Sequence, residues 1–251
     1  SRTPVDAYSG FEGSAPEKYK LAYFKNALEH PGLDPEIAGA INTFIQQLPA
    51  DRYEVTALNF EELDYVVPAY YVLTTAEASS NLSRYDGVRY GYRTPSPPAD
   101  LTAFYRQSRS EGFGKEVKRR IMLGSFVLSA GYYDAYFTKA QQVRRRLAEK
   151  TAELFKTFNA IILPTVPAPA FKFGEKTADP VSMYLADIYT VFANLTGIPA
   201  ISIPLFTHSN GMPFGLQIMT SQFSELSLLK LSHQMMCTAQ NTSSQIQQIH
   251  P

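Results

Sequence analysis

The chain has 251 residues, of which 45% are hydrophobic and 18% are charged, and its 23 Lys and Arg balance its 23 Asp and Glu. This composition is typical of a globular protein and excludes a disordered, collagen-like or disulfide-stapled chain. Zero net charge excludes a general attraction to nucleic acid, although a local basic face stays open, and no apolar run approaches the roughly 20 residues of a membrane helix.

The first third of the chain predicts a strand–helix–strand unit. Tyr19–Phe24 and Tyr53–Phe60 are short runs typical of strands. Between them, Asp34 can cap a helix that Pro35 opens, and apolar residues recur at helical spacing until Pro49. This order indicates an α/β fold with a parallel or mixed sheet flanked by helices.

The middle of the chain predicts helices. Val66–Leu82 and Leu101–Ser110 each predict one helix, and a loop rich in proline separates them. The helical pattern continues over Lys115–Phe158 as two or more helices, with a break at Gly131. A buried strand is expected at Asn159–Leu163.

The last third predicts a helix over Met183–Leu195 and then a hairpin. Its strands are Ala200–Pro204 and Pro213–Met219, and the turn Asn210-Gly211 between them is a strong hairpin signal. A final amphipathic helix is expected to follow.

We predict three parts along the chain. Residues 1–16 are rich in Ser, Gly and Pro and read as a linker that follows a cut in a longer protein. Residues 17–240 are expected to form one domain, which ends with a helix over Leu226–Met236. Residues 241–251 are rich in Gln and Ser and are expected to form a flexible tail.

Metal binding is not expected. The chain has four histidines without any recognised ligand spacing, and Cys237 is its one cysteine, which also excludes an internal disulfide. A single cysteine fits a reducing, cytoplasmic compartment.

Two arginine-rich segments could bind a ligand. Ser79–Arg93 gathers arginine and tyrosine, which suit planar or anionic groups; the alternative is a loop held by Arg–Asp pairs and tyrosine packing. Gly112–Arg120 places cations in the first turns of a helix, against the helix dipole. Arg119 or Arg120 could therefore hold a carboxylate, and the alternative is a solvated face.

Asp187 is the third candidate, because its predicted helix is apolar nearly all round. A carboxylate there is costly to bury unless it is paired, so it either emerges at an edge or faces a polar pocket. A carboxylate beside an arginine would clamp a zwitterion such as an amino acid. No GxSxG, phosphate-loop or GxGxxG motif accompanies these residues. The residues alone indicate a polar pocket and no particular reaction.

Three long blocks of sequence resemble the amidase signature family, and within it the glutaminase (A) subunits of tRNA-dependent amidotransferases. The blocks are Pro68–Arg93, Glu111–Lys139 and Pro164–Gly197, and the resemblance runs from about Lys20 to about Leu229. The family fold is one α/β/α domain around a large mixed sheet. The resemblance therefore implies that residues 17–240 are the C-terminal part of such a domain.

The resemblance implies that the glutaminase subunit hydrolyses glutamine to ammonia. In the family, the B subunit uses the ammonia with ATP and Mg to convert Glu-tRNA(Gln) or Asp-tRNA(Asn) to Gln-tRNA(Gln) or Asn-tRNA(Asn), and the small C subunit joins the other two. The implied partners are thus the B and C subunits, glutamine and the mischarged tRNA. No cofactor is expected in this chain itself, and no membrane partner.

The resemblance also implies the positions of the site residues. In the family's Ser–cis-Ser–Lys triad, the Lys lies in a strand–loop region and the two serines in a Gly/Ser-rich stretch, all in the N-terminal half of the family pattern. This sequence has no such stretch, so no catalytic residue is assigned and the chain alone is expected to be inactive. The glutamine pocket maps onto Tyr70, Arg120 and Asp187. Arg120 would hold the carboxylate, Asp187 the ammonium group, and Tyr70 would line the pocket. The choice of Arg120 over Arg119 rests on register with the family motif.

Two alternatives stay open. One is another amidase-signature hydrolase that acts on a simple amide, for which a zwitterion clamp would be unnecessary. The other is a stand-alone, non-catalytic module that binds a partner through its helical surface.

Overall fold

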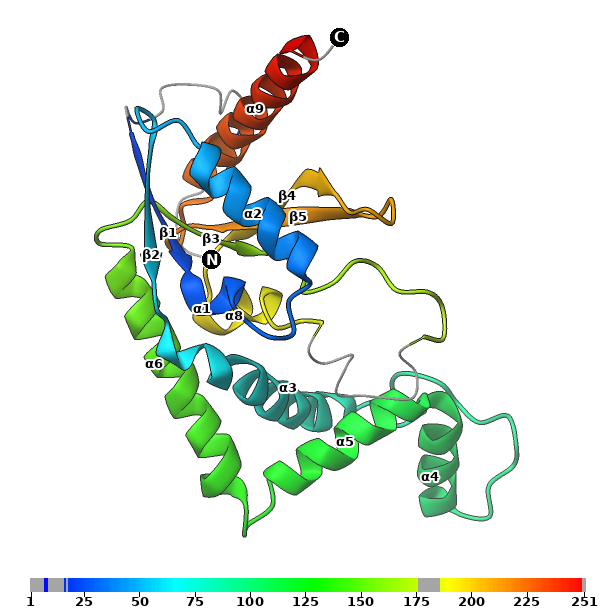
Figure 1. Cartoon of the computed structure of the whole chain (residues 1–251). Coiled ribbons are helices and arrows are strands. Elements are labelled where there is room, and N and C mark those ends of the chain that lie inside the picture. The colour runs from blue at the N-terminus through cyan, green and yellow to red at the C-terminus, as the bar shows by residue number, and fades with distance from the viewer. Residues whose placement is uncertain (1–6, 9–15, 17, 176–185, 250–251) are drawn as a thin grey trace. The chain divides into compact units, whose positions relative to one another are not determined.

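The computed structural model describes residues 7–8, 16, 18–175 and 186–249 (Figure 1). The chain divides into two compact units, which we call the sheet unit (Ser1–Val67 and Arg145–Pro251) and the helical unit (Pro68–Arg144). Most of the predicted linker over residues 1–16 lies outside the described residues. The expectation of one domain over residues 17–240 stays a prediction.

Within the described part of the sheet unit, five strands form one sheet in the order β2-β1-β3-β5-β4. β1 (Tyr19–Phe24) is parallel to both β2 (Tyr53–Leu58) and β3 (Ala160–Pro164). β5 (Pro213–Met219) is antiparallel to β3 and to β4 (Ala200–Thr207). The predicted mixed sheet with flanking helices is confirmed.

Two helices connect the parallel strands β1 and β2, as a crossover between parallel strands requires. They are the short α1 (Lys25–Leu28) and the longer α2 (Pro35–Gln47), which crosses in front of the sheet in Figure 1. The carboxylate of Asp34 caps α2, because its Oδ1 accepts hydrogen bonds from the backbone N–H groups of Glu36 at 2.8 Å and Ile37 at 3.3 Å. The predicted start of this helix is confirmed.

The predicted turn between the last two strands is also confirmed. Gly211 has a φ of 85°, which favours glycine, and its N–H donates to the carbonyl oxygen of His208 at 2.8 Å. The chain then forms α9 (Glu225–Ile249), which continues through residues 241–249, where the sequence pattern favours a tail.

The core of the sheet unit is centred on β3, all of whose residues are buried. Both faces of a central strand are covered, which explains its continuous apolar run. Beside it, the ring of Phe24 stacks on Phe60 with centroids 4.6 Å apart, and Phe192 of α8 (Thr190–Thr196) meets Phe24 edge-on at 5.6 Å. Residues from three distant parts of the chain thus share one core.

The helical unit contains most of α3, all of α4, α5 and the short π-helix η2, and the start of α6. Their bounds are Val66–Leu82, Leu101–Gly112, Lys115–Val127, Asp134–Thr138 and Lys139–Leu154. α3 has the predicted bounds. The long helical stretch breaks around Gly131, as predicted, but it ends four residues before Phe158, because a turn precedes β3.

Helices α3 and α5 pack closely at Gly124. A Cβ atom at this position would collide with the carbonyl oxygen of Thr75 and with the side chain of Ser79. The Oγ atoms of Ser79 and Ser125 lie 3.0 Å apart across the same contact, and the Ser125 hydroxyl also donates to the carbonyl oxygen of Ile121 at 2.9 Å. Small residues therefore allow the two helices to approach, and these serines take part in their packing.

Candidate functional site

Arg120 lies on α5 and shares one carboxylate with Arg119. The Nε of Arg120 is 3.1 Å from Glu116 Oε1, and the Nη1 of Arg119 is 2.9 Å from Glu116 Oε2. Glu116 offsets the two cations near the positive end of the helix, where they would otherwise be unfavourable. All three side chains are 40–46% exposed, so these ion pairs contribute little to stability, about 0–1 kcal/mol each.

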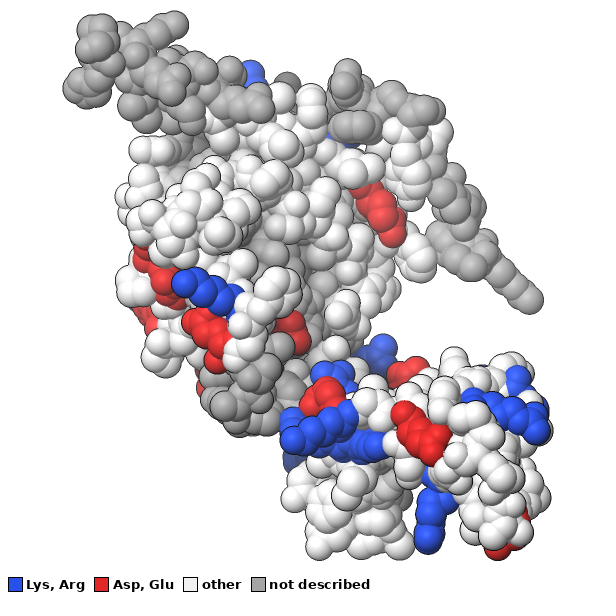
Figure 2. Space-filling view, turned by 90° about the vertical axis from the view of Figure 1, so that its right-hand side faces the viewer, with Lys and Arg blue, Asp and Glu red and all other residues white. Residues whose placement is uncertain are grey.

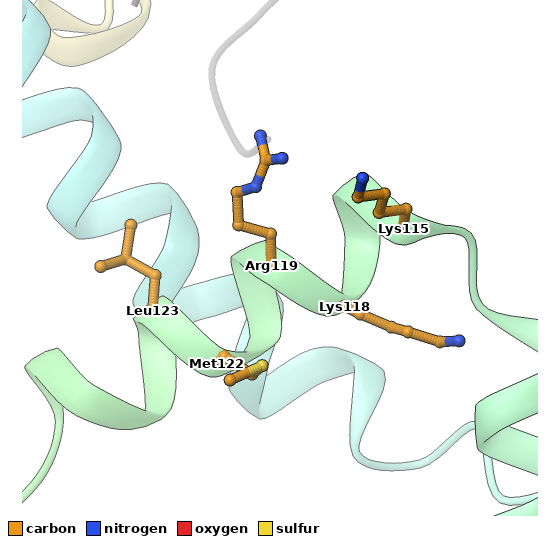
Figure 3. Close-up of a pocket in the computed structure, with 5 residues that line it drawn as sticks. All are labelled: Lys115, Lys118, Arg119, Met122 and Leu123. Atoms are coloured by element: carbon orange, nitrogen blue, oxygen red, sulfur yellow. The ribbon is translucent and has the colours of Figure 1, made fainter. Parts of the chain in front are cut away.

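An open hollow lies along the same helix (Figure 3). It has a volume of about 590 Å³ and is lined by Lys115, Lys118 and Arg119 together with Met122 and Leu123. Figure 3 shows the cationic side chains extending in different directions from the first turns of α5, with Met122 and Leu123 further along the helix. The sequence pattern indicates this run of cations but not the apolar residues, because apolar residues on a helix more often belong to a buried face.

Tyr70 lies near the start of α3 and is half-buried. Its ring meets that of Tyr71 edge-on with centroids 5.3 Å apart, and its carbonyl oxygen accepts a hydrogen bond from the Thr74 hydroxyl at 2.8 Å. Tyr70 and Arg120 therefore both belong to the helical unit, on the two helices that pack at Gly124.

Asp187 belongs to the sheet unit and lies in a turn, with its side chain exposed. The predicted helix over Met183–Leu195 is wrong at residues 186–189, since α8 begins only at Thr190; residues 183–185 lie outside the described part. The turn is held by Tyr189, whose buried hydroxyl donates to the carbonyl oxygen of Ala27 at 2.9 Å. This long-range anchor overrides the local helical pattern.

The three predicted pocket residues thus fall in both units. Tyr70 and Arg120 are placed in one unit and Asp187 in the other, and the clamp that would join them stays a prediction. Both possibilities considered for Asp187, emergence at an edge and a place in a polar pocket, are compatible with an exposed side chain in a turn.

The two units carry opposite charge. The helical unit has 11 Lys and Arg against 6 Asp and Glu, a net charge of +5, whereas the sheet unit has 12 against 17, a net charge of −5. Figure 2 shows Lys and Arg side chains gathered over the helical unit. The zero net charge of the whole chain therefore conceals a basic unit and an acidic one.

Neither a metal site nor a membrane span is found in the part of the chain that the structure describes. No group of three or more His, Cys, Asp or Glu side chains there could hold a metal ion. None of the described helices is both long enough and apolar enough to cross a bilayer.

Comparison with known proteins gives consistent matches. The family model described as Amidase matches residues 1–229. The A subunit of the glutamyl-tRNA(Gln) amidotransferase of Acidobacterium capsulatum is 55% identical over 200 residues, which cover 80% of this chain and 42% of that protein. The protein of the same name from Koribacter versatilis is 50% identical over 202 residues, with the same coverage. The chain spans about two fifths of the length of these curated relatives.

Two solved structures share the fold. The A subunit of the glutamyl-tRNA(Gln) amidotransferase of Thermotoga maritima matches with a TM-score of 0.62 and 36% identity, over 84% of this chain and 40% of that one. The 6-aminohexanoate cyclic dimer hydrolase, complexed with substrate, matches with a TM-score of 0.69 and 19% identity, over 94% of this chain and 48% of its own. At 19% identity, the second match shows the fold alone.

Proposed function

Because this chain belongs to the amidase family, as its sequence resemblance predicts, we propose that it contributes to the glutaminase subunit of a tRNA-dependent amidotransferase. The observation that carries the proposal is its 55% identity to the A subunit of a glutamyl-tRNA(Gln) amidotransferase over 80% of the chain. In this role, ammonia released from glutamine is used on the B subunit, with ATP and Mg held there, to amidate Glu-tRNA(Gln) or Asp-tRNA(Asn). The C subunit joins the two larger ones.

In the proposed pocket, Arg120 holds the α-carboxylate of glutamine, Asp187 holds its α-ammonium group, and Tyr70 lines the pocket. A guanidinium has five N–H donors in a planar fork that suits a carboxylate, as the hydrogen bond from Arg120 to Glu116 illustrates. The exposed carboxylate of Asp187 suits an ammonium group that arrives from solvent. We assign no catalytic residue to this chain and expect no glutamine hydrolysis from it alone.

The first test compares two neighbouring arginines in the complete glutaminase subunit, assembled with its B and C partners. Arg120→Ala removes a charge-assisted hydrogen bond to the substrate, worth about 1.5–3 kcal/mol, so the KM for glutamine should rise roughly 10- to 150-fold. Arg119→Ala is the matched control, because Arg119 is bound to the same Glu116 carboxylate and is similarly exposed. An unchanged KM in Arg120→Ala would contradict the pocket assignment.

Truncated substrates identify which group each residue binds. 4-Aminobutanamide lacks the α-carboxylate of glutamine, so the wild-type and Arg120→Ala enzymes should hydrolyse it equally. Glutaramate lacks the α-ammonium group, so the wild-type and Asp187→Ala enzymes should hydrolyse it equally. If a variant loses as much activity on its truncated substrate as on glutamine, the residue does not bind the missing group.

The alternative of a simple amide hydrolase has weaker support. The similar hydrolase structure is 19% identical and shows only the fold, whereas the relatives at 36–55% identity are amidotransferase subunits. A simple amide such as propionamide carries neither charge that the proposed clamp binds. Efficient hydrolysis of propionamide, with glutamine a poor substrate, would favour this alternative.

A further inference from the structure

The loop between α3 and α4 displays two tyrosines and two arginines that the proposed glutamine pocket does not use. We call Arg84, Tyr85, Arg89 and Tyr90 the Tyr/Arg platform. All four side chains are exposed: Tyr85 to 43%, Tyr90 to 56% and the side chain of Arg89 to 71%. The ring centroids of the two tyrosines lie 6.2 Å apart and the ring planes are tilted by 48°, so the two exposed rings are neighbours.

Asp86 holds the backbone of this loop in a tight turn. Its Oδ1 accepts hydrogen bonds from the backbone N–H groups of Val88 at 2.8 Å and Arg89 at 3.1 Å, and these bonds hold the pKa of its carboxyl below the ordinary value. The N–H of Gly87 donates to the carbonyl oxygen of Tyr90 at 3.0 Å. The loop conformation is therefore set before any ligand binds.

Helix α4 also holds this loop in place. The Nη1 of Arg109 donates to the carbonyl oxygens of Leu82 at 2.8 Å and Tyr85 at 3.0 Å. Gly87 has a φ of 82° and packs so closely on Ser108 that a Cβ atom would come within 2.9 Å of that side chain. The backbone is thus tied to a helix, while the large side chains of the platform are left exposed. Such preorganisation lowers the entropy cost of binding.

The carboxylates near the platform are already engaged. Asp86 binds the loop backbone, Asp100 caps α4 by accepting from the N–H of Ala103 at 2.7 Å, and Glu111 accepts from Gln107 at 2.9 Å and from the Tyr92 hydroxyl at 3.1 Å. Arg89 is paired with Asp86, whose Oδ2 lies 3.2 Å from its Nη2, but its side chain is still 71% exposed. Arg84 is exposed as well, and both arginines belong to a unit with a net charge of +5. The surface is therefore suited to a polyanion.

We propose that the Tyr/Arg platform binds a single-stranded segment of RNA. Unpaired bases stack on exposed aromatic rings regardless of sequence, and the exposed arginines of the same loop can bind the phosphates. The choice of RNA rather than DNA rests on the proposed function, in which a tRNA is amidated by the complex.

An acidic protein surface is the rival occupant. It would satisfy the arginines, but it would not use two adjacent exposed rings on a rigid loop in the way that unpaired bases do. The two occupants also differ in what they require: stacking requires free bases, whereas an acidic surface requires only charge. A test that separates the rings from the charges therefore decides between them.

The experiment measures the affinity of the 251-residue chain for a fluorescein-labelled, mixed-sequence RNA of about ten nucleotides by anisotropy, at several salt concentrations. Tyr90→Ala should weaken binding roughly 5- to 150-fold, the range for loss of one base-stacking partner. The double variant Arg84→Gln/Arg89→Gln should also flatten the slope of log K against log salt by about 1.4, because each lost phosphate contact removes about 0.7.

Matched controls lie in the sheet unit. Tyr65 is 58% exposed and Arg145 has a side chain that is 82% exposed, so Tyr65→Ala and Arg145→Gln remove an equally accessible ring and cation away from the platform. Both should leave RNA affinity unchanged, and Tyr90→Phe should retain it because the ring is kept. Equal affinities for Tyr90→Ala and Tyr65→Ala, both shown to be folded by circular dichroism, would overturn the proposal.

Two further probes test the choice of ligand. A blunt RNA duplex offers no free bases, so its binding should be weaker and insensitive to Tyr90→Ala. Single-stranded DNA that binds as tightly as RNA would overturn the choice of RNA. These measurements contain no glutamine, so they can fail while the glutaminase proposal stands, and a failed glutaminase test leaves the RNA affinities to be judged separately.

Discussion

The sheet unit and the helical unit differ in how completely they bury their largest apolar side chains. The largest fully buried side chains of the described residues, such as Tyr189, Phe24 and Leu147, all belong to the sheet unit. The helical unit leaves Met122 73% exposed and Phe126 43% exposed. One unit therefore carries the core, whereas the other displays aromatic, apolar and cationic groups that can bind ligands.

Truncating one apolar side chain in each unit tests the difference in burial most directly. Ile162 of β3 is 1% exposed, so Ile162→Ala should lower the free energy of unfolding by about 2–5 kcal/mol. Met122→Ala should change it by less than about 0.5 kcal/mol, because the side chain is mostly in water. Urea denaturation measures both, and similar losses in the two variants would contradict the contrast.

A buried carboxylate gives the sheet unit a dependence on pH. Glu62 lies in the short helix η1 (Glu61–Tyr65), and its side chain, 6% exposed, pairs with Lys150 and with Arg146, whose Nε is 2.9 Å from Oε1. Burial alone would raise the pKa of this carboxyl, but the two cations hold it below the ordinary value. Its contribution to stability is therefore present above the unfolded-state pKa and is lost as pH falls through the folded-state pKa.

Glu62→Gln should accordingly remove about 1.5–3 kcal/mol at neutral pH and flatten the acid limb of a plot of stability against pH. Glu149→Gln is the control: Glu149 pairs with Arg145 on α6, but both side chains are well exposed, so its loss should cost less than about 0.5 kcal/mol. Parallel acid limbs for wild type and Glu62→Gln would show that this carboxylate does not set the pH dependence.

Replacing one glycine by alanine in each unit should have opposite effects on stability. Gly124→Ala in the helical unit should destabilise by about 1–3 kcal/mol, because the added Cβ meets the Thr75 backbone, which cannot move away cheaply. Gly39→Ala in α2 of the sheet unit meets nothing within 4 Å and should stabilise by about 0.5–1 kcal/mol, since alanine is the better helix former. Thermal unfolding would reveal the opposite signs, and equal signs would refute the α3–α5 contact.

Local signals account for the elements that were predicted correctly. The Asp34 cap and the glycine turn at Gly211 act over a few residues, so α2 and the last hairpin were readable from sequence. The helix predicted around Asp187 failed because the Tyr189 hydroxyl bonds to Ala27, 162 residues away, and holds a turn there. A hydrophobic pattern over a few turns of helix gives no information about a contact between residues so far apart in the chain.

The residues of the candidate site also fall into those that the sequence indicates and those that it does not. Cations in the first turns of a helix indicate Arg119 and Arg120 without a preference for either, and in the structure both bind the same Glu116 carboxylate. The apolar lining of the nearby hollow, Met122 and Leu123, was missed because exposed and buried apolar residues have the same spacing on a helix.

The class of fold, the Asp34 cap and the turn at Gly211 follow from the sequence alone, since they depend on neighbouring residues and on side-chain type. The choice of Tyr70, Arg120 and Asp187 as zwitterion-binding residues also comes from the sequence and stays a prediction. Tertiary structure alone decided the strand order, the close contact at Gly124, and the division of Tyr70 and Arg120 from Asp187 between two units of opposite charge. These features arise from contacts between residues that are far apart in the chain, which local patterns do not encode.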